Sequence, residues 1–486
     1  MADATRLAAL LGPWRDGDRA GGPQFARLAA ALAAAIEDGS LDGVALPAER
    51  RLAAALGVSR STVVRAYESL RRQGLVASRE RSGTVVRPLR RRLVAPQGQM
   101  FQLAQLLGDE GGIDLSVASP AVDELVAGIG VSLAQASGHG YVPRGLPALR
   151  SAIAERLTAQ GAPTAPDEVL ITSGAHEGLT LLAGLLVGRH QPVAVDEVTY
   201  AGALEVLDRA GGVPVGVPGD RAGMRSDALR DVLARRGAGF VLLMPGLHNP
   251  AGTSIAAGRR PALLAAAAEF DALVVEDAAL DDVRFEDGPP TLRALAPERV
   301  LSVGSFSKVA WGGLRVGWIC GPRELIGRLA RLKGARDIGA GALGQLAALQ
   351  VLERIDELRA ARREQARRRL ELLRSELAAR VPEWRLGEPE GGWSLWVDLG
   401  RCDGDAFTAA AARHGVLVSP GSSHVAGGGP STHVRLAFAA DDELLREGAR
   451  RLAAAWAEVA QPAATPAGTT SSQCAKRGSS PRTASP

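Results

Sequence analysis

Lys308 is the residue whose type and position could most directly do chemistry. It follows an apolar stretch in VLSVGSFSKVAWGGLRVGW, and only Lys333 and Lys476 share its type among 57 basic residues. A primary amine can lose its proton and form a Schiff base with an aldehyde, which an arginine cannot do. Taken alone, Lys308 could equally be a surface lysine in a loop.

Residues that suit an aromatic cofactor follow other apolar stretches. Asp277 ends LVVED, where a carboxylate can keep a pyridine nitrogen protonated. Tyr200 follows PVAVDEVT and could stack on an aromatic ring. Asn249, the single asparagine of the chain, lies in MPGLHNPAG and could donate to a phenolic oxygen of that ring. These scarce residue types occurring together favour a cofactor site over a surface loop.

A second group of residues suits a phosphate. Gly174 and Ala175 follow VLIT and could offer backbone N–H groups at the start of a helix. Ser305, Ser307 and Arg315 lie close in sequence to the candidate lysine and could bind the same phosphate. A phosphorylated aromatic aldehyde is therefore the expected ligand.

The elements that must position these residues are predicted to form an α/β fold. Seven apolar runs, VLITSG, PVAVDE, VPVGVP, FVLLMPG, LVVED, VLSVGSFSK and VGWICG, alternate with helical segments. This pattern predicts a mostly parallel seven-stranded sheet with helices on both faces. Ligands gather at the carboxyl ends of such strands, so the candidate residues should meet at one edge. Long helices over residues 341–380 and strands at WSLWVDL and THVRLAF predict a smaller α+β domain.

The amino-terminal part is basic and has a different pattern. Residues 46–92 hold twelve arginines against three acids, which favours a polyanion as partner, although a solvated basic face is the simpler alternative. Helical periodicity over residues 24–38, 47–56 and 59–73, with a glycine after each, predicts three helices. LVASRERSGTVV predicts two strands joined by a turn at Ser82 and Gly83. The short turn between the last two helices is typical of a helix-turn-helix, so we expect an α+β winged helix.

The third helix of this unit is the expected reading helix. The second helix of a helix-turn-helix lies in the major groove, where Arg, Ser and Thr in its first turn contact base edges. Those positions are Ser59, Arg60, Ser61 and Thr62. A winged helix that contacts protein instead of DNA is the alternative.

The winged helix carries a family resemblance. LPAERRLAAALGVSRSTVVRAYESLRRQGLV, followed by SGTVV, resembles the DNA-binding domain of GntR-type repressors. The resemblance implies that Arg50 and Arg60 reach the DNA. It also implies that Gly83 and Thr84 form a wing tip in the minor groove.

The larger part resembles fold-type I aminotransferases over residues 110–460, and the fusion resembles MocR-type regulators. The resemblance implies that pyridoxal 5'-phosphate is bound covalently by Lys308, paired with Asp277 and held at its phosphate by the second group of residues. It implies that Tyr141, in YVPRGLPALR, reaches the phosphate of the other subunit of a homodimer. Arg435, in THVRLAF, would bind the carboxylate of an amino-acid ligand, with a solvated strand arginine as the alternative.

The chain departs from this family after Asp277. Family enzymes carry a tyrosine two or three residues after the aspartate, where this chain has Ala279 and Leu280. The ring oxygen of the cofactor would lose a donor, and Asn249 is the main remaining candidate. This departure argues against efficient transamination.

The expected organisation is a winged helix over residues 1–87, a basic linker over 88–110, an aminotransferase-like domain over 111–460 and a disordered tail over 461–486. The longest apolar run, from Gly178 to Gly188, is shorter than the roughly 18 residues of a membrane span, so a cytoplasmic location is expected. The three cysteines, Cys320, Cys402 and Cys474, lack the spacing of a disulfide framework or a zinc site.

These features predict a DNA-binding transcriptional regulator that senses a small amine or amino acid through the cofactor. Two other functions stay open. The chain could be a working aminotransferase that also binds DNA, or a regulator for which the cofactor is either purely structural or itself the signal. The target genes, the sign of regulation and the effector are not specified by the sequence.

Overall fold

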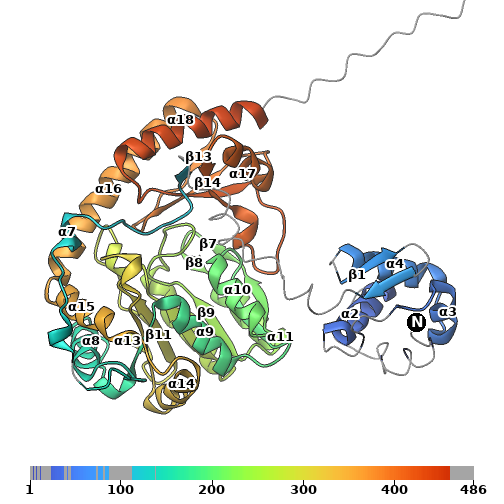
Figure 1. Cartoon of the computed structure of the whole chain (residues 1–486), viewed down its shortest axis with the longest axis horizontal. Coiled ribbons are helices and arrows are strands. Elements are labelled where there is room, and N and C mark those ends of the chain that lie inside the picture. Colours follow the sequence, from blue (N-terminus) through green and yellow to red (C-terminus); the bar gives the residue numbers. More distant parts are fainter. Residues whose placement is uncertain are drawn as a thin grey trace, which may run out of the picture. The chain divides into compact units, whose positions relative to one another are not determined.

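The structure is a computed structural model that describes residues 4, 7, 11, 23–37, 41, 45–72, 75–79, 83–86, 112–136 and 138–459. The chain divides into two compact units, Met1–Gln102 and Leu103–Pro486, each described here by itself (Figure 1). The predicted linker, the predicted tail and the turn at Ser82 lie outside the described residues.

The first unit has the helices and strands of a winged helix. They are α2 (Gln24–Glu37), α3 (Glu49–Leu56), α4 (Arg60–Arg72) and the antiparallel pair β1 (Val76–Arg79) and β2 (Gly83–Val86). Apolar side chains at helical spacing, such as Leu28, Leu32 and Leu52, are fully buried between these elements. Gly57 ends α3 in the left-handed conformation, with φ 62°, which a glycine adopts without strain. The predicted α+β winged helix is confirmed.

The second unit is built on a large sheet whose strands are the seven predicted stretches. In spatial order they are β4 (Val169–Thr172), β12 (Gly317–Cys320), β11 (Val300–Ser305), β10 (Leu273–Asp277), β9 (Phe240–Leu243), β5 (Pro192–Asp196) and β6 (Val213–Val217). Strand β12 runs antiparallel to both neighbours, whereas the other paired strands are parallel. The expected mostly parallel sheet is confirmed.

Helices cover both faces of this sheet (Figure 1). They are α8 (Pro147–Ala159), α9 (Ala175–Leu186), α10 (Ala201–Arg209), α11 (Ser226–Arg236), α12 (Arg260–Glu269), α13 (Leu292–Leu295) and α14 (Arg323–Arg336). Along β9, Phe240 and Leu242 pack into one hydrophobic cluster, and Val241 and Leu243 into another on the opposite face. Burial on both faces explains the continuous apolar runs of the sequence.

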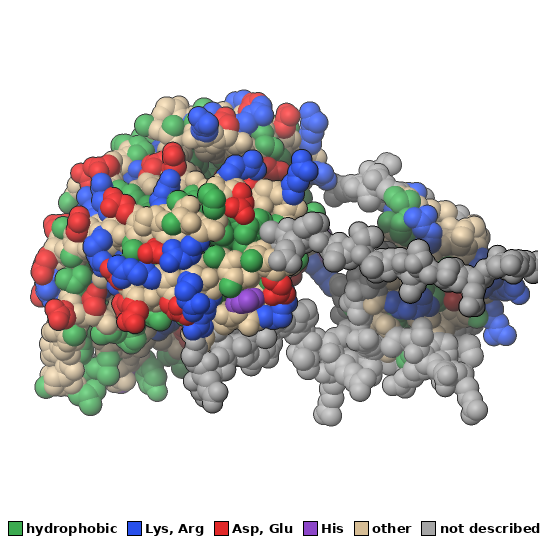
Figure 2. All heavy atoms as spheres, turned by 90° about the horizontal axis from the view of Figure 1, so that it is seen from above, with side chains coloured by type: hydrophobic (Ala, Val, Ile, Leu, Met, Phe, Trp, Pro, Cys, Tyr) green, Lys and Arg blue, Asp and Glu red, His purple; other side chains and the backbone are tan. Residues whose placement is uncertain are grey.

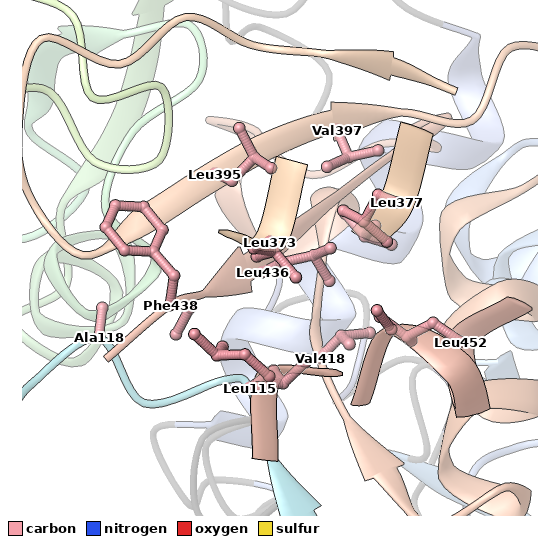
Figure 3. Packing of buried hydrophobic residues seen from close by; sticks show 14 of the residues in the cluster. Leu115, Ala118, Leu373, Leu377, Leu395, Val397, Val418, Leu436, Phe438 and Leu452 are labelled. Atoms are coloured by element: carbon pink, nitrogen blue, oxygen red, sulfur yellow. The ribbon is translucent and has the colours of Figure 1, made fainter. Parts of the chain in front are cut away.

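A smaller α+β part completes the second unit. It contains α16 (Ile355–Arg380), β13 (Arg385–Leu386), β14 (Ser394–Asp398), α17 (Gly404–Arg413), β15 (Val416–Leu417), β16 (Ser419–Pro420), β17 (His433–Ala437) and α18 (Asp442–Val459). The helix before it, α15 (Ala342–Glu353), packs instead with α8 beside the large sheet. Strands β13, β14, β17 and β16 form an antiparallel sheet in that order. The short β3 (Ile113–Asp114) pairs with β15, and Leu115 and Ala118 after it join the core of this part (Figure 3). Shorter elements are α7 (Glu124–Ala127), β7 (Gly219–Asp220) and β8 (Gly223–Met224).

The surface of the second unit carries both signs of charge. On the face drawn in Figure 2, acidic and basic side chains are interspersed over it. Within the described ranges, no helix combines the length and the apolar composition that a membrane span requires.

Candidate functional site

Lys308 lies in the turn that follows β11. Its Nζ donates to the backbone carbonyl of Ala118 at 2.7 Å, and Trp393 Nε1 donates to the Lys308 carbonyl at 2.9 Å. Burial, together with the positive charge of Arg435, lowers the pKa of Lys308 to about 8. A usable fraction of this amine is therefore neutral, and hence nucleophilic, near neutral pH.

Asp277 ends the neighbouring strand β10. Its side chain is buried, with 4% of the residue exposed, and Oδ1 accepts from the Ala279 N–H at 3.0 Å. Burial raises the pKa of Asp277 to about 6, although the Ala279 N–H and the charge of Lys308 oppose this shift. A buried carboxylate of this kind is stabilised by a protonated ring nitrogen beside it.

Arg435 extends from β17 of the smaller part, with only 3% of the residue exposed. Its Nη1 donates to Asn249 Oδ1 at 3.0 Å, and its Nη2 donates to the Ser116 carbonyl. Its Nε is buried without a partner among the described residues. Burial lowers the pKa of Arg435 to about 10, so the guanidinium keeps its charge at neutral pH. A buried arginine with an unused donor is suited to bind an anionic group.

The start of α9 forms a narrow cradle. Gly174 precedes this helix with φ 99°, and a Cβ there would approach the guanidinium of Arg315 to between 3.2 and 3.4 Å. A Cβ on Gly317 of β12 would lie 2.9 Å from the Ala175 nitrogen. Arg315 Nη2 donates to the Ser173 carbonyl, and this bond positions the guanidinium beside the helix start. This arrangement combines a helix N-terminus with a fixed cation, which suits a phosphate.

Two hydroxyls come from the end of β11 and from the turn that follows it. Ser305 Oγ donates to Ser307 Oγ at 2.9 Å and accepts from the Ser307 N–H at 3.1 Å. The same hydroxyl lies 3.5 Å from the carbonyl of Val316, the residue after Arg315. The structure thus brings both serines to the turn that carries Lys308.

The two predicted tyrosines differ in their surroundings. Tyr200 precedes α10 and is partly buried, and burial, with the charge of Asp277, raises its pKa. Tyr200 therefore lies close enough to Asp277 and Arg435 for their charges to affect its pKa. Tyr141 is 64% exposed, and its N–H donates to His139 Nδ1 at 3.1 Å. The described contacts of Tyr141 do not include Lys308, Asp277 or Arg435.

The positions that lack the family tyrosine are filled differently. Ala279 uses its backbone N–H on Asp277, and Leu280 is buried in the hydrophobic core of the smaller part. Neither residue supplies a hydroxyl.

Sequence reasoning missed two features of this site. Backbone carbonyls of Ser116 and Ala118 accept from Arg435 and Lys308, and every residue carries such a carbonyl, so no signal could reveal them. His424 is buried, with Nδ1 2.8 Å from the Thr199 carbonyl and Nε2 3.1 Å from Ser419 Oγ. Burial and the nearby Arg435 lower the pKa of His424 to about 3, which makes it a neutral structural residue.

The expected reading helix α4 begins with a cluster of hydroxyls. Ser59 Oγ accepts from the Thr62 N–H at 3.1 Å, which is the bond of a helix N-cap. The same oxygen lies 2.8 Å from both Ser61 Oγ and Thr62 Oγ1. Arg60 is exposed beside this cluster and is free to reach outward.

The remaining predicted DNA contacts are placed as follows. Arg50 is exposed on α3. Gly83 begins β2, opposite Arg79. Thr84 is only 8% exposed, and its Oγ1 accepts from Arg71 Nη2 at 3.2 Å, so its side chain is held inside the unit. Its contact with DNA stays a prediction.

The two folds define a class of protein, a DNA-binding winged helix joined to an aminotransferase-like unit with a partly buried lysine at its candidate site. The chain matches the family of aminotransferase class I and II over residues 105–452 and that of bacterial regulatory proteins, gntR family, over residues 25–86. It therefore belongs to the aminotransferase class I and II family, in the MocR-type arrangement with a GntR-type winged helix.

Similar sequences include both regulators and enzymes. The uncharacterized HTH-type transcriptional regulator YisV of Bacillus subtilis is 28% identical over 428 residues, which cover 82% of this chain and 88% of that protein. The 2-aminoadipate transaminase of Thermus thermophilus is 32% identical over 334 residues, covering 66% and 81%. The HTH-type pyridoxine biosynthesis transcriptional regulator PdxR of Corynebacterium glutamicum is 31% identical over 310 residues, covering 62% and 67%.

Similar solved structures include aminotransferases. The α-aminoadipate aminotransferase of Thermus thermophilus, complexed with N-(5'-phosphopyridoxyl)-L-leucine, has a TM-score of 0.67 and 28% identity, covering 75% of this chain and 97% of that chain. The kynurenine aminotransferase of Pyrococcus horikoshii has a TM-score of 0.70 and 26% identity, covering 76% and 97%.

Proposed function

We propose that this chain is a transcriptional regulator that binds DNA through its winged helix and senses a small amine or amino acid through pyridoxal 5'-phosphate on Lys308. The observation that carries the proposal is the partly buried Lys308, whose pKa is shifted by burial and by the charges of Arg435 and Asp277, in a chain that also has a GntR-type winged helix. Because its target is chromosomal DNA, we place the protein in the cytoplasm.

The residues present fit the cofactor. The cradle of Gly174, Ala175 and Arg315 suits its phosphate. Asp277 suits its ring nitrogen because the buried carboxyl gains a cationic neighbour. Asn249 is the residue we assign to its ring oxygen, and Tyr200 to its ring face. Ser305 and Ser307 add hydroxyl donors to the phosphate.

Each residue then has a defined task. When bound, the cofactor supplies an aldehyde carbon that can be exchanged between Lys308 and a free amine. Lys308 Nζ would bind this carbon as the neutral amine, which its lowered pKa provides. Arg435 would bind a ligand carboxylate, and Asp277 would hold a proton on the ring nitrogen of the cofactor. Without the phenol that enzymes of this family carry, we expect little sustained transamination.

One alternative effector has specific support. PdxR of Corynebacterium glutamicum is named a regulator of pyridoxine biosynthesis, so the cofactor itself could be the signal in this chain. The two functions differ in one measurement, because an amine sensor changes its DNA affinity when amine is added to the cofactor-loaded protein.

We propose a homodimer formed through the face near Lys308. Apolar side chains exposed there include Val117, Val122, Leu133, Tyr141, Trp311, Ile338 and Leu343. Their segments pack against one another, since Gln350 Nε2 donates to the Gly130 carbonyl at 2.7 Å and a Cβ on Gly339 would lie 2.6 Å from the Val142 carbonyl. An exposed apolar face of this kind favours a second copy as its cover. Tyr141 would then reach the phosphate of the other subunit.

The deciding experiment compares wild type with Lys308→Ala. Wild type should gain visible absorbance with pyridoxal 5'-phosphate, and borohydride should fix the cofactor to the peptide that contains Lys308. Lys308→Ala should lose both signals, and Lys476→Ala, in which another of the scarce lysines is removed, should keep them. An unchanged spectrum in Lys308→Ala would remove this lysine from the cofactor site.

The same proteins distinguish a sensor from an enzyme. A coupled assay over many amino donors and keto acids should find at most slow turnover. Rapid multiple turnover would contradict a sensing role for this unit, whereas amine-dependent change in DNA affinity would support it.

A further inference from the structure

Lys333 is a buried lysine that the proposed cofactor chemistry does not use. It lies on α14 with its side chain 0% exposed, in a chain that has three lysines among 57 basic residues. Its Nζ donates to Glu177 Oε1 at 2.7 Å and to Asp337 Oδ2 at 2.5 Å. A buried ammonium without such partners is strongly unfavourable, so the two carboxylates explain how Lys333 is tolerated. What these carboxylates contact in turn indicates what Lys333 does.

Glu177 lies in the first turn of α9, the helix whose start forms the proposed phosphate cradle. Its Oε2 accepts from the Ser173 N–H, and the Ser173 carbonyl accepts from Arg315 Nη2. Ser173, Glu177 and Arg315 also line one cavity, of about 570 Å³. The carboxylate of Glu177 is therefore bonded to the residue that precedes Gly174, beside the cradle.

A carboxylate in this place has two opposite effects on the cradle. It satisfies the Ser173 N–H, and an anion is favourable beside the partial positive charge of a helix start. It also repels a phosphate at the same helix start, because both groups are negatively charged. Glu177 would therefore order the cradle and weaken its binding of phosphate, unless a cation balances its charge.

Lys333 supplies that cation from a neighbouring helix. Helix α14 packs beside α9, and the hydrogen bonds described for Lys333 Nζ go to the two carboxylates (Figure 1). Asp337 fixes the ammonium from the other side, and its Oδ1 accepts from the Gly339 N–H at 2.9 Å. Although burial opposes the shift, the hydrogen bond from Lys333 lowers the pKa of Asp337. A compact ammonium with three donors can serve two carboxylates at once, which suits lysine at this position.

We infer that Lys333 is a positioning residue of the phosphate cradle, whose charge neutralises Glu177 so that this carboxylate can hold Ser173 without repelling the phosphate of a ligand. The inference rests on the proposed function and adds the residue that sets the preference for a phosphorylated ligand. A purely structural role, in which the three charged residues only fasten α14 to α9, is the alternative that the experiment must separate from it.

Variants that remove the charges in different combinations test the inference. Lys333→Met removes the cation and leaves the carboxylate of Glu177 beside Ser173. Lys333→Met/Glu177→Gln removes both charges and keeps an amide oxygen that can accept from the Ser173 N–H. Lys333→Met/Asp337→Asn is the matched control, because it also removes one cation and one carboxylate but leaves Glu177 in place.

The readout is the ratio of two affinities of the full chain, one for pyridoxal 5'-phosphate and one for pyridoxal, which has the same aldehyde without the phosphate. Absorbance titration at fixed pH measures both. Lys333→Met should lower this ratio by about tenfold or more, because an unbalanced carboxylate then lies beside the phosphate. Lys333→Met/Glu177→Gln should restore the ratio, whereas Lys333→Met/Asp337→Asn should stay low.

Glu177→Gln alone keeps the test decisive if Lys333→Met does not fold. This variant buries no unpaired carboxylate, and Lys333 remains paired with Asp337. Because a negative charge beside the cradle is removed, the ratio should rise above that of wild type. A ratio that stays equal or falls in Glu177→Gln would overturn the inference.

The remaining outcomes separate this inference from the proposed function. Equal losses in Lys333→Met and Lys333→Met/Glu177→Gln would assign the three charged residues a structural role and overturn the inference, while the cofactor site stands. A wild type that binds neither aldehyde would overturn the proposed function. Inorganic phosphate, followed by its effect on the thermal unfolding of the same variants, then tests the cradle by itself. The same order of affinities would support the role of Lys333, and equal affinities would overturn it.

Discussion

At the scale of residues, the two charges beside Lys308 shift the pKa of its amine in opposite directions. Burial and then the charge of Arg435 lower the pKa of Lys308 to about 8, whereas the charge of Asp277 opposes this shift. The protein thus holds a partly buried amine that is close to half deprotonated at about pH 8. The two partners lie on β17 and β10, so the tuning depends on both parts of the second unit.

The rate of cofactor capture should follow this balance. In wild type it should rise with pH through about 8, because only the neutral amine attacks. Arg435→Gln should move the midpoint to higher pH, since a cation that disfavours the ammonium form is removed. Asp277→Asn should move it to lower pH. Stopped-flow absorbance against pH measures all three, and shifts in the same direction for both variants would refute the assignment.

Asp277 should lower the free energy of unfolding of the cofactor-free protein. Burial raises its pKa from the ordinary value of 3.8 to about 6 in the folded protein. The loss of stability therefore grows as pH rises from about 4 to 6 and is complete above 6, because the unfolded chain ionises more readily than the folded protein. Asp277→Asn should therefore raise the free energy of unfolding at pH 7 by about 2 to 3 kcal/mol, while cofactor affinity falls. Denaturant titration of the cofactor-free protein measures the stability.

Asp281→Asn is the matched control for that measurement. Burial raises the pKa of Asp281 to about 8, and its Oδ1 is buried with no hydrogen-bond partner among the described residues. Its replacement should stabilise the protein and leave cofactor affinity unchanged. A loss of cofactor affinity in both variants would mean that the effect of Asp277→Asn is general.

At the scale of elements, the sequence predicted the strands of the large sheet well and their directions less well. Continuous apolar runs identify strands that are buried on both faces, as β9 is. The antiparallel direction of β12 depends on the short connection from β11, which periodicity does not report. The predicted side chains of the site were recognisable by scarce types at strand ends. The carbonyls of Ser116 and Ala118 were not, because the fold alone brings them to Lys308 and Arg435.

Helix α4 is the helix expected to contact base edges, and a substitution of Arg60 tests this role. Arg60→Ala should weaken binding to the operator by ~1 to 3 kcal/mol and reduce discrimination from random duplex, if the guanidinium meets a base edge. Gel-shift titration at fixed salt measures both. Arg328→Ala, an exposed arginine of α14, removes the same charge and should have little effect. Equal losses on operator and random DNA would assign Arg60 to the phosphate backbone.

At the scale of the whole molecule, assembly should decide how strongly the protein binds DNA. A dimer presents two winged helices to two half-sites, and linkage of two binding events raises affinity well beyond that of one. The exposed apolar face near Lys308 is the surface we assign to this contact.

Leu133→Asp/Leu343→Asp should therefore give a monomer. Leu133 is 75% exposed, and burying two new carboxylates in an interface is unfavourable. Light scattering should show the lower mass, and operator affinity should fall by roughly 10²-fold or more. Leu444→Asp, on α18, changes a leucine of similar exposure to Leu343 outside this face and should stay dimeric. A dimer that survives the double change would place the interface elsewhere.

The hydroxyl cluster at the start of α4 has a consequence for how such a regulator changes its targets in evolution. Ser59, Ser61 and Thr62 hold the N-cap of the helix that is expected to read DNA. A substitution there that suits a new operator also alters the folding of the winged helix, with a cap worth about 1 kcal/mol at stake. Arg60 lies outside this cluster, so it can vary without that cost. Divergence of binding sites among close relatives should therefore begin at position 60 and reach its neighbours later.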